Sequence, residues 1–330
     1  MNKKLVFSLS ILLIAGYSIT AYSSGISVED KTLLDTAKGI FKPLPSVIDS
    51  PKSNLSTPDK VKLGKKLFFE KELSMDKSMS CNTCHQLESF GAENRATSIG
   101  FKKHTGSRNS PSVYNAGLHF TQFWDGRAKD LEEQAGGSVL NPGEMAMPNE
   151  KVVLERLSKH KEYPSLFKKV FGTTNISYDE LRQSIAAFER TLVTPSRFDK
   201  YLKGDINALT VSERQGLRTF VNKGCISCHN GVAVGGGMFQ KFGVVNPYQF
   251  QKDLGRFEVT KKEEDKYVFK VPSLRNVANT SPYFHDGKVK TLKEAIKTMG
   301  KTQLGLNLTA QEINSIETFL KSLTGQKPKI

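Results

Sequence analysis

Apolar residues recur at spacings of three and four positions in several segments of this chain, and polar residues suited to cap a helix precede them. Ser177 and Glu180 have the spacing of a capping box, in which each side chain accepts a hydrogen bond from the other residue's backbone N–H. The apolar face that follows consists of Leu181, Ile185, Phe188 and Leu192. The same device starts three further predicted helices, at Thr210 with Glu213, Thr291 with Glu294, and Thr309 with Glu312. These segments predict amphipathic helices.

The rest of the pattern adds more helix, two loops and little strand. Helices are also predicted at residues 29–41, from Pro58 onward and at 149–160. Two polar stretches without periodicity predict long loops, at 91–106 and 136–148. Alternation typical of a short strand occurs at Tyr267, Phe269 and Val271. The fold class is therefore predicted to be mainly α, and Pro195, which follows the helix that starts after Ser177, marks the expected domain boundary.

The first residues indicate an export signal. Met1-Asn2-Lys3-Lys4 is positively charged, and an apolar run covers residues 5–14. Small residues before Ser23 place the expected cleavage after it, so residues 1–23 are predicted to be a signal peptide. The alternative is an uncleaved membrane anchor, but the run is short for a span and no later segment is apolar enough to cross a bilayer. We expect the mature protein in the periplasm.

The charge balance is strongly basic, with 48 Lys and Arg against 33 Asp and Glu and a formal net charge of +15. Nucleic acid is a common partner of such chains, but the lysines are scattered along predicted helices rather than clustered. An exported protein also rarely meets nucleic acid. We therefore expect no nucleic-acid partner, and interpret the charge as steering a small, acidic partner protein.

Two C-x-x-C-H runs carry the chemistry, Cys81 to His85 and Cys225 to His229. The pairs Cys81 with Cys84 and Cys225 with Cys228 have the spacing that forms thioethers to the two vinyl groups of a haem, and the following histidine becomes the proximal iron ligand. The chain has four cysteines and all lie in these runs, so no further Cys pair completes a zinc site. A thioredoxin-like pair does not require the histidine. Two covalently bound haem c groups are predicted, one in each half.

The sixth iron ligand decides between electron transfer and peroxide chemistry, since methionine suits the former and an open position the latter. The downstream methionines are Met145, Met147, Met238 and Met299. Met299 is favoured, because it ends an apolar helical face next to Gly300, where backbone can approach a porphyrin. For the first haem, spacing does not choose among His104, His119 and His160.

The chain resembles the bacterial dihaem cytochrome c peroxidases over nearly the whole mature sequence. The segments that carry the resemblance are 80–85, 97–100, 108–111, 122–128, 144–145, 267–275, 283–287, Met299 and 303–304. It implies two cytochrome c-like haem domains, an N-terminal peroxidatic domain at 24–195 and a C-terminal electron-transfer domain at 196–330. The first haem would reduce hydrogen peroxide, and the second would relay electrons from a donor such as cytochrome c. A homodimer is also implied.

The resemblance further implies roles for particular residues. Met299 would be the distal ligand of the second haem, Trp124 would lie between the haems, and His285 would sit beside the second haem's propionates. A structural calcium would be bound by Asn109 and by the backbone of Thr280 and Pro282. Gln134 and Glu144 would line the peroxide pocket.

The role of Glu144 also agrees with simple acid–base chemistry. Cleavage of the O–O bond requires a proton to move from one peroxide oxygen to the other, and a carboxylate within hydrogen-bond reach can take and return it. Without the resemblance, Glu144 would be interpreted as an exposed loop acid. Two other functions are a dihaem electron carrier without catalysis, and a dihaem oxidase of the methylamine-utilisation type acting on a partner protein. The latter have Tyr where this chain has Met299.

One position departs from the family. Many relatives have, after Thr97-Ser98-Ile99-Gly100, a histidine that ligates the first haem in the oxidised resting state. Here that residue is Phe101, which cannot bind iron. His104 is the nearest substitute and a possible switch ligand. We expect the first haem to be open at rest, since His104 could bind only after a three-residue shift of its loop.

Overall fold

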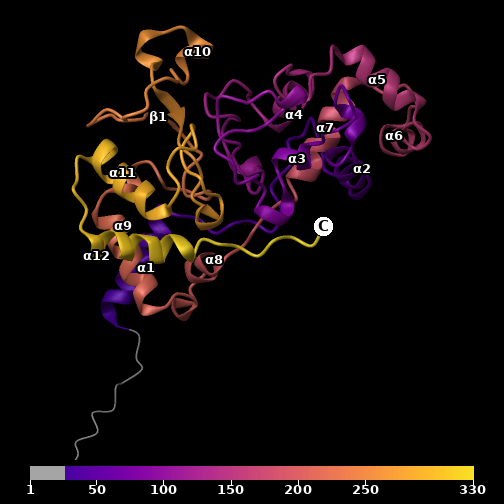
Figure 1. The fold of residues 1–330 in the computed structure, drawn as a ribbon. Coiled ribbons are helices and arrows are strands. Elements are labelled where there is room, and N and C mark those ends of the chain that lie inside the picture. Colours follow the sequence, from indigo (N-terminus) through magenta and orange to yellow (C-terminus); the bar gives the residue numbers. More distant parts are fainter. Residues whose placement is uncertain (1–26) are drawn as a thin grey trace, which may run out of the picture.

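A computed structural model describes residues 27–330, and the predicted signal peptide lies outside the described residues. Helices dominate this part of the chain, with one two-stranded sheet (Figure 1). The helices before Pro195 are α1 (Val28–Ile40), α2 (Pro58–Phe68), α3 (Cys81–Cys84), α4 (Leu131–Leu140), α5 (Glu150–Lys159), α6 (Tyr163–Phe171) and α7 (Tyr178–Glu189). The prediction of a mainly helical fold is confirmed.

The second half of the chain adds five helices and both strands. They are α8 (Arg197–Leu202), α9 (Val211–Asn222), β1 (Phe239–Lys241), α10 (Phe257–Thr260), β2 (Val268–Lys270), α11 (Leu292–Leu304) and α12 (Ala310–Lys321). Short 3-10 helices occur at Lys71–Leu73, Leu87–Ser89, Phe101–Lys103, Ala116–Leu118, Ile206–Ala208, Cys225–Ser227, Glu263–Asp265 and Val277–Asn279. The strands pair antiparallel, with Phe239 opposite Lys270. No helix among residues 27–330 is long and apolar enough to cross a membrane.

The predicted helix caps are present. Ser177, Thr210, Thr291 and Thr309 each form a capping box with the glutamate three positions on. Each box satisfies two backbone N–H groups that a helix start leaves without partners, and such caps contribute about 1 kcal/mol. Gly300, beside Met299, lies within α11, which continues to Leu304 and is terminated by Gly305 in the left-handed region.

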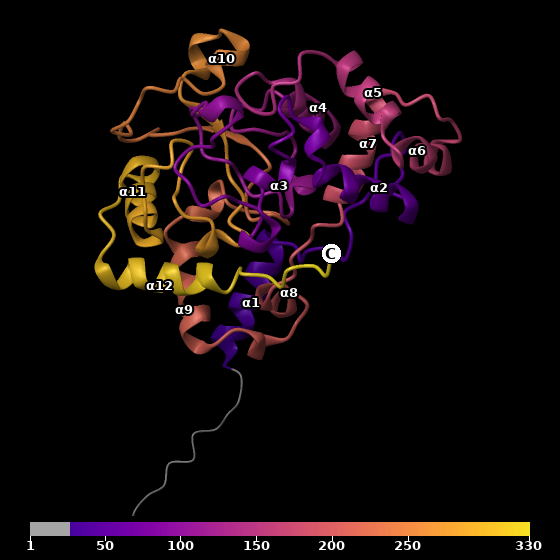
Figure 2. The ribbon, with the colours of Figure 1, turned by 45° about the vertical axis from the view of Figure 1, so that its right-hand side comes forward.

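Two separate hydrophobic cores organise the molecule into two lobes. The first lobe is built from α2 and α4–α7, and the second from α1, α8, α9, α11 and α12. Figures 1 and 2 show these groups on opposite sides of the molecule. α1 thus contributes to the second core, although it precedes the first lobe in the chain, because Leu33, Leu34 and Phe41 pack with Phe198 and Leu217 there.

Each lobe contains a close crossing of two helices at a glycine. Gly64 of α2 lies against the backbone of Ser184 in α7, where an added Cβ would come within 1.8 Å of the carbonyl oxygen. Gly216 of α9 lies in the same way against Ser315 of α12, at 2.1 Å. Any side chain at either position would force the helices apart. The crossings fix the helix that leads into each C-x-x-C-H run.

A hairpin is also repeated in the two lobes. Gln122 pairs antiparallel with Ala128 in the first, and Tyr283 pairs with Val289 in the second. The sequences between them match as Phe-Trp-Asp-Gly-Arg and Phe-His-Asp-Gly-Lys. Their φ angles match too, at 63° and 69° for the phenylalanines and 69° and 59° for the glycines. Trp124 and His285 therefore occupy equivalent positions of one repeated element.

Candidate functional site

The first C-x-x-C-H run lines a cavity in the first lobe. Cys81 begins α3, whose start is closed by reciprocal bonds between Ser80 and Thr83, and His85 ends the helix. Cys81, Cys84 and His85 all line this first cavity. Nδ1 of His85 is 3.0 Å from the carbonyl oxygen of Pro111, which fixes the ring and assigns the proton to Nδ1. Burial lowers the pKa of His85, so the imidazole is neutral and Nε2 is free to bind a metal ion.

The wall of the first cavity carries a buried carboxyl and several polar groups. Gln134 and Ser138 of α4 line it, and Nε2 of Gln134 donates to Oγ of Ser138 at 3.1 Å. Glu144 lines it from the loop after α4, and accepts a hydrogen bond from Nδ2 of Asn141 at 2.8 Å. Arg127 lies 3.9 Å from the same carboxylate oxygen. The structure therefore brings the predicted pair Gln134 and Glu144 together, with polar neighbours that the sequence did not indicate.

The environment of Glu144 suits proton transfer. Burial raises its pKa, against the opposing effects of Ser138, Arg127 and Asn141. A raised pKa makes the carboxylate a better proton acceptor, and the carboxyl that results can return the proton. Glu144 is therefore not an exposed loop acid, because it is partly buried and lines the first cavity.

A short hairpin borders the first cavity and contains Phe101, the position at which many relatives have a histidine. Ile99 pairs with Thr105, and the N–H of Phe101 donates to the carbonyl oxygen of Glu144 at 2.9 Å. His104 is exposed and lines the cavity, with its ring against Gly143, whereas Phe101 is absent from the cavity wall. His104 is thus at the cavity that holds His85. His160 lies away from it, where its ring contacts Tyr163 with centroids 4.8 Å apart.

The second run lines a more apolar cavity in the second lobe. Cys225, Cys228 and His229 lie on one side of it. Burial lowers the pKa of His229, and the backbone at Val234 and Pro272 raises it by a smaller amount. The resulting pKa is about 4, so this imidazole is also neutral. A neutral histidine behind each cysteine pair is what a haem iron requires.

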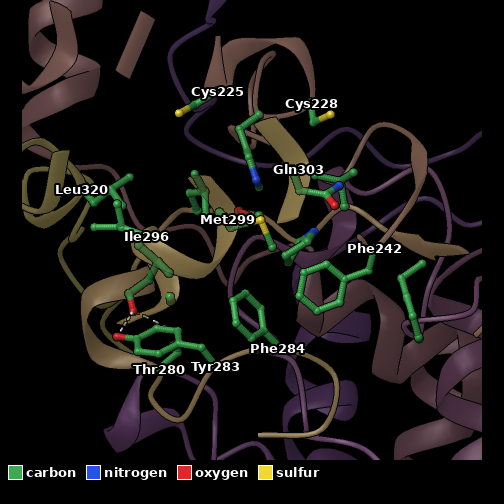
Figure 3. A pocket seen from close by; sticks show the side chains of 18 of the residues that line it. Cys225, Cys228, Phe242, Thr280, Tyr283, Phe284, Ile296, Met299, Gln303 and Leu320 are labelled. Atoms are coloured by element: carbon green, nitrogen blue, oxygen red, sulfur yellow. Dashed lines mark hydrogen bonds between the residues drawn. The ribbon is translucent and has the colours of Figure 1, made fainter. Parts of the chain in front are cut away.

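Met299 is the methionine that reaches the second cavity. It lies on α11 with Gln303, and Figure 3 shows its sulfur pointing into the space beside Cys225 and Cys228. Met238, another of the four downstream methionines, does not line this cavity. The other two methionines belong to the first lobe, where Met145 lines the first cavity and Met147 is buried in the core.

The two cavities meet at a shared wall. Trp124 and Asn109 line both of them, and Nε1 of Trp124 donates to the carbonyl oxygen of Asn109 at 2.8 Å. His285 lines the second cavity and is 3% exposed, with its ring stacked on Phe269 at 4.2 Å between centroids. The N–H of Asn109 donates to the carbonyl oxygen of His285 at 2.7 Å. These contacts lock the repeated hairpins of the two lobes to each other.

Oxygen atoms suited to a hard cation also lie at this wall. Asn109, Thr280 and Pro282 line the second cavity together. Nδ2 of Asn109 donates to the carbonyl oxygen of Arg95 at 2.7 Å, which leaves its Oδ1 as an acceptor. Among the described residues, no hydrogen bond is donated to that Oδ1 or to the carbonyl oxygens of Thr280 and Pro282. These three oxygens fit calcium, which binds carbonyl, amide and water oxygens, although no acidic cluster joins them within residues 27–330.

The sequence patterns did not indicate three side chains that line these cavities. The sequence indicates His119 only as a candidate iron ligand and gives no signal for Lys270 or Glu189. Lys270 and His119 line both cavities, and Glu189 lines the first from α7. The one signal that could have indicated the shared wall is the repeated Asp-Gly-Arg and Asp-Gly-Lys hairpin, which brings Trp124 and His285 to equivalent places.

Comparisons with known proteins agree with this arrangement. The sequence profile of the family described as di-haem cytochrome c peroxidase matches residues 58–207. The cytochrome c551 peroxidase of Nitrosomonas europaea is 48% identical over 272 residues, which cover 82% of this chain and 81% of that protein. That of Pseudomonas aeruginosa is 42% identical, covering 97% and 94%. The crystal structure of a MauG-like protein associated with microbial copper homeostasis has a TM-score of 0.76 at 28% identity, covering 86% of this chain and 94% of that one.

Proposed function

This chain belongs to the di-haem cytochrome c peroxidase family and is an enzyme that reduces hydrogen peroxide, and on this premise we propose that electrons enter at the second lobe and are used at the first. The observation that carries the proposal is the difference between the two cavities. The first has Glu144 and Gln134 on its wall, and the second has Met299. Thioether ligation suits a high-potential relay, and a polar, open cavity suits peroxide.

The residues of the first lobe are proposed to hold one haem and to move the protons. Cys81 and Cys84 attach it, and His85, oriented by Pro111, binds its iron. Bound haem iron supplies the electrons and the site of O–O cleavage. Glu144 takes the proton from one peroxide oxygen and delivers it to the other, so that water can leave. Gln134, fixed by Ser138, orients the peroxide.

The second lobe is proposed to receive the electrons. Cys225 and Cys228 would attach its haem, and His229 and Met299 would supply the protein ligands to its iron. Trp124, which lines both cavities, connects the two sites. Asn109, Thr280 and Pro282 are proposed to bind calcium at this junction, where the cation would hold the hairpins of both lobes in place.

A basic surface with exposed apolar residues next to α11 supports the choice of donor. Val244 and Val245 are 53% and 54% exposed, and the N–H of Val245 donates to the carbonyl oxygen of Thr302 at 3.0 Å. Lys241 and Lys301 are exposed beside them. We propose that this surface binds a small acidic donor protein such as a cytochrome c, that the enzyme works in the periplasm and that it forms a homodimer, as its family resemblance implies.

Steady-state turnover of protein matured in the periplasm tests the activity at its proposed site. The protein should carry two haems by the pyridine haemochrome assay and should oxidise a reduced small cytochrome with hydrogen peroxide. Glu144→Gln should lower that rate by roughly 10²–10⁴-fold, the usual contribution of general acid–base catalysis. Glu150→Gln, an exposed glutamate at the start of α5, is the matched control. Undiminished turnover in Glu144→Gln would remove Glu144 from the mechanism.

A further inference from the structure

Lys270 is a buried cation without a carboxylate partner among the described residues. It ends strand β2 and is 4% exposed. The buried arginines differ from it, because Arg190 and Arg275 each pair with a carboxylate, at 2.8 and 2.9 Å. Burying an ammonium group without a counter-charge costs several kcal/mol. The buried ammonium of Lys270 therefore requires a negatively charged partner that the described residues do not supply.

The partner that Lys270 has is a histidine of the other lobe. Nζ of Lys270 lies 3.3 Å from Nδ1 of His119. An ammonium can only donate, so Nδ1 accepts and the neutral ring carries its proton on Nε2. That Nε2 is buried and has no hydrogen-bond partner within residues 27–330. The pair presents N–H donors from both residues and no acceptor.

The electrostatics of the pair point to an anion. Burial lowers the pKa of Lys270 to about 8, and burial and the nearby ammonium hold the pKa of His119 well below its usual range. Both effects are those of a site that lacks negative charge. A carboxylate in contact with the pair would reverse them, because an opposite charge favours the ionised ammonium.

The position of the pair identifies the carboxylate. Lys270 and His119 line both cavities, at the wall the two cavities share. The N–H of Lys270 donates to the carbonyl oxygen of Trp124 at 2.7 Å, which fixes the end of β2 to the first lobe. Gly236 closes over the ring of His119, where an added Cβ would lie 2.5 Å from Cδ2. The anions that belong in these cavities are the propionates of the haems.

We propose that Lys270 and His119 form a receptor for a haem propionate at the junction of the two lobes. The receptor compensates the negative charge of the propionate and so raises the reduction potential of the haem that carries it, because reduction removes positive charge from the iron. It requires only the two haems and not the proposed direction of electron transfer. Lys270 is thus a positioning and charge-setting residue rather than a catalytic one.

Spectroelectrochemical titration of the dihaem protein tests the receptor. In Lys270→Met the redox equilibrium constant of one haem should change at least tenfold toward the oxidised form. For a one-electron couple this lowers the reduction potential of that haem by about 59 mV or more. Lys270→Gln removes the positive charge but keeps a polar side chain, and it should lower the potential of that haem by a similar amount. Lys270→Arg should retain most of the wild-type value. Lys262→Met, which removes an exposed lysine near β2, is the matched control and should change neither haem.

The titration also distinguishes the two possible sources of the propionate. A shift of the low-spin, methionine-ligated haem assigns the carboxylate to the second cavity, and a shift of the other haem assigns it to the first. The propionate bending bands in the resonance Raman spectrum of the same haem should move in Lys270→Met and in His119→Phe. Wild-type potentials of both haems in Lys270→Met and Lys270→Gln, with two haems bound per chain, would overturn the proposal.

Discussion

Trp124 and His285 hold equivalent positions in the two repeated hairpins, and their rings meet edge to face with centroids 6.3 Å apart and planes inclined at 72°. The contact joins the two lobes at the wall between the cavities. The same backbone therefore presents an indole from one lobe and an imidazole from the other. Since Trp124 is held by the carbonyl oxygen of Asn109, its ring has a fixed orientation between the two sites.

Replacing Trp124 should slow electron transfer between the lobes. Trp124→Phe keeps an aromatic ring but loses the hydrogen bond to Asn109 and part of the contact with His285. We expect turnover with donor and peroxide to fall by about tenfold, a cost of about 1.4 kcal/mol in the barrier. Stopped-flow reduction of the second haem by the donor should be unchanged. A variant with wild-type turnover would exclude Trp124 from the pathway.

Replacing Met299 should lower the potential of the second haem. In Met299→His an imidazole would replace the thioether, and imidazole stabilises ferric iron more than thioether does. Spectroelectrochemistry of the variant should show a lower potential and donor-driven turnover should slow. Met238→His is the control, because Met238 does not line the cavity and its replacement should leave the potential unchanged. A lower potential in Met238→His, with an unchanged potential in Met299→His, would identify Met238 as the iron ligand.

The first haem is expected to be open in the oxidised enzyme. His104 lies at the first cavity but is exposed, and its N–H and carbonyl oxygen are bonded within its own hairpin to Phe101 and Gly100. EPR of the ferric protein should show a high-spin first haem, and His104→Ala should leave that signal in place. A low-spin bis-histidine signal that disappears in His104→Ala would instead establish His104 as a switch ligand that leaves on reduction.

Glu189 should make the first lobe less stable as the pH rises. Burial raises the pKa of this carboxyl, which lines the first cavity, to about 8. The folded state then binds a proton that the unfolded state releases near pH 4.5, so stability falls between about pH 4.5 and 8. Glu189→Gln should remove this slope and be more stable than wild type at pH 8, by on the order of 2 kcal/mol. Denaturant unfolding at pH 5 and 8 measures it.

The control for Glu189 is Glu155→Gln, which changes an exposed glutamate of α5. It should leave the pH dependence of unfolding as it is in wild type. If Glu189→Gln and wild type show the same slope between pH 5 and 8, the carboxyl is ionised in the folded protein and has a counter-charge that the described contacts do not include.

Local features of the site could be predicted from the sequence, and contacts across the lobes could not. The capping boxes and the C-x-x-C-H runs involve residues within four positions of each other, so their spacing determines their geometry. Spacing does not determine how Lys270 meets His119, 151 positions earlier in the chain. That contact depends on how β2 packs against the first lobe, and neither residue shows a pattern that indicates it.

The choice among the methionines shows the same limit. Met299 was favoured for a glycine beside it, but α11 continues through that glycine. Met299 reaches the cavity because α11 packs with its apolar face toward the second core, where Ile296 is buried. The structure thus brings Met299 to the second cavity for a tertiary reason, which differs from the local reason on which the prediction rested. Its role as an iron ligand is a prediction that the reduction potential of the second haem in Met299→His tests.

The two half-reactions, measured separately by stopped flow, test the division of labour between the lobes most directly. In Glu144→Gln the donor should reduce the second haem at the wild-type rate, while reoxidation of the reduced enzyme by peroxide should be slowed by roughly 10²-fold or more. In Met299→His the donor step should be slowed and the peroxide step of enzyme reduced beforehand by dithionite should be retained. Loss of the donor step in Glu144→Gln, with the peroxide step intact, would contradict the account.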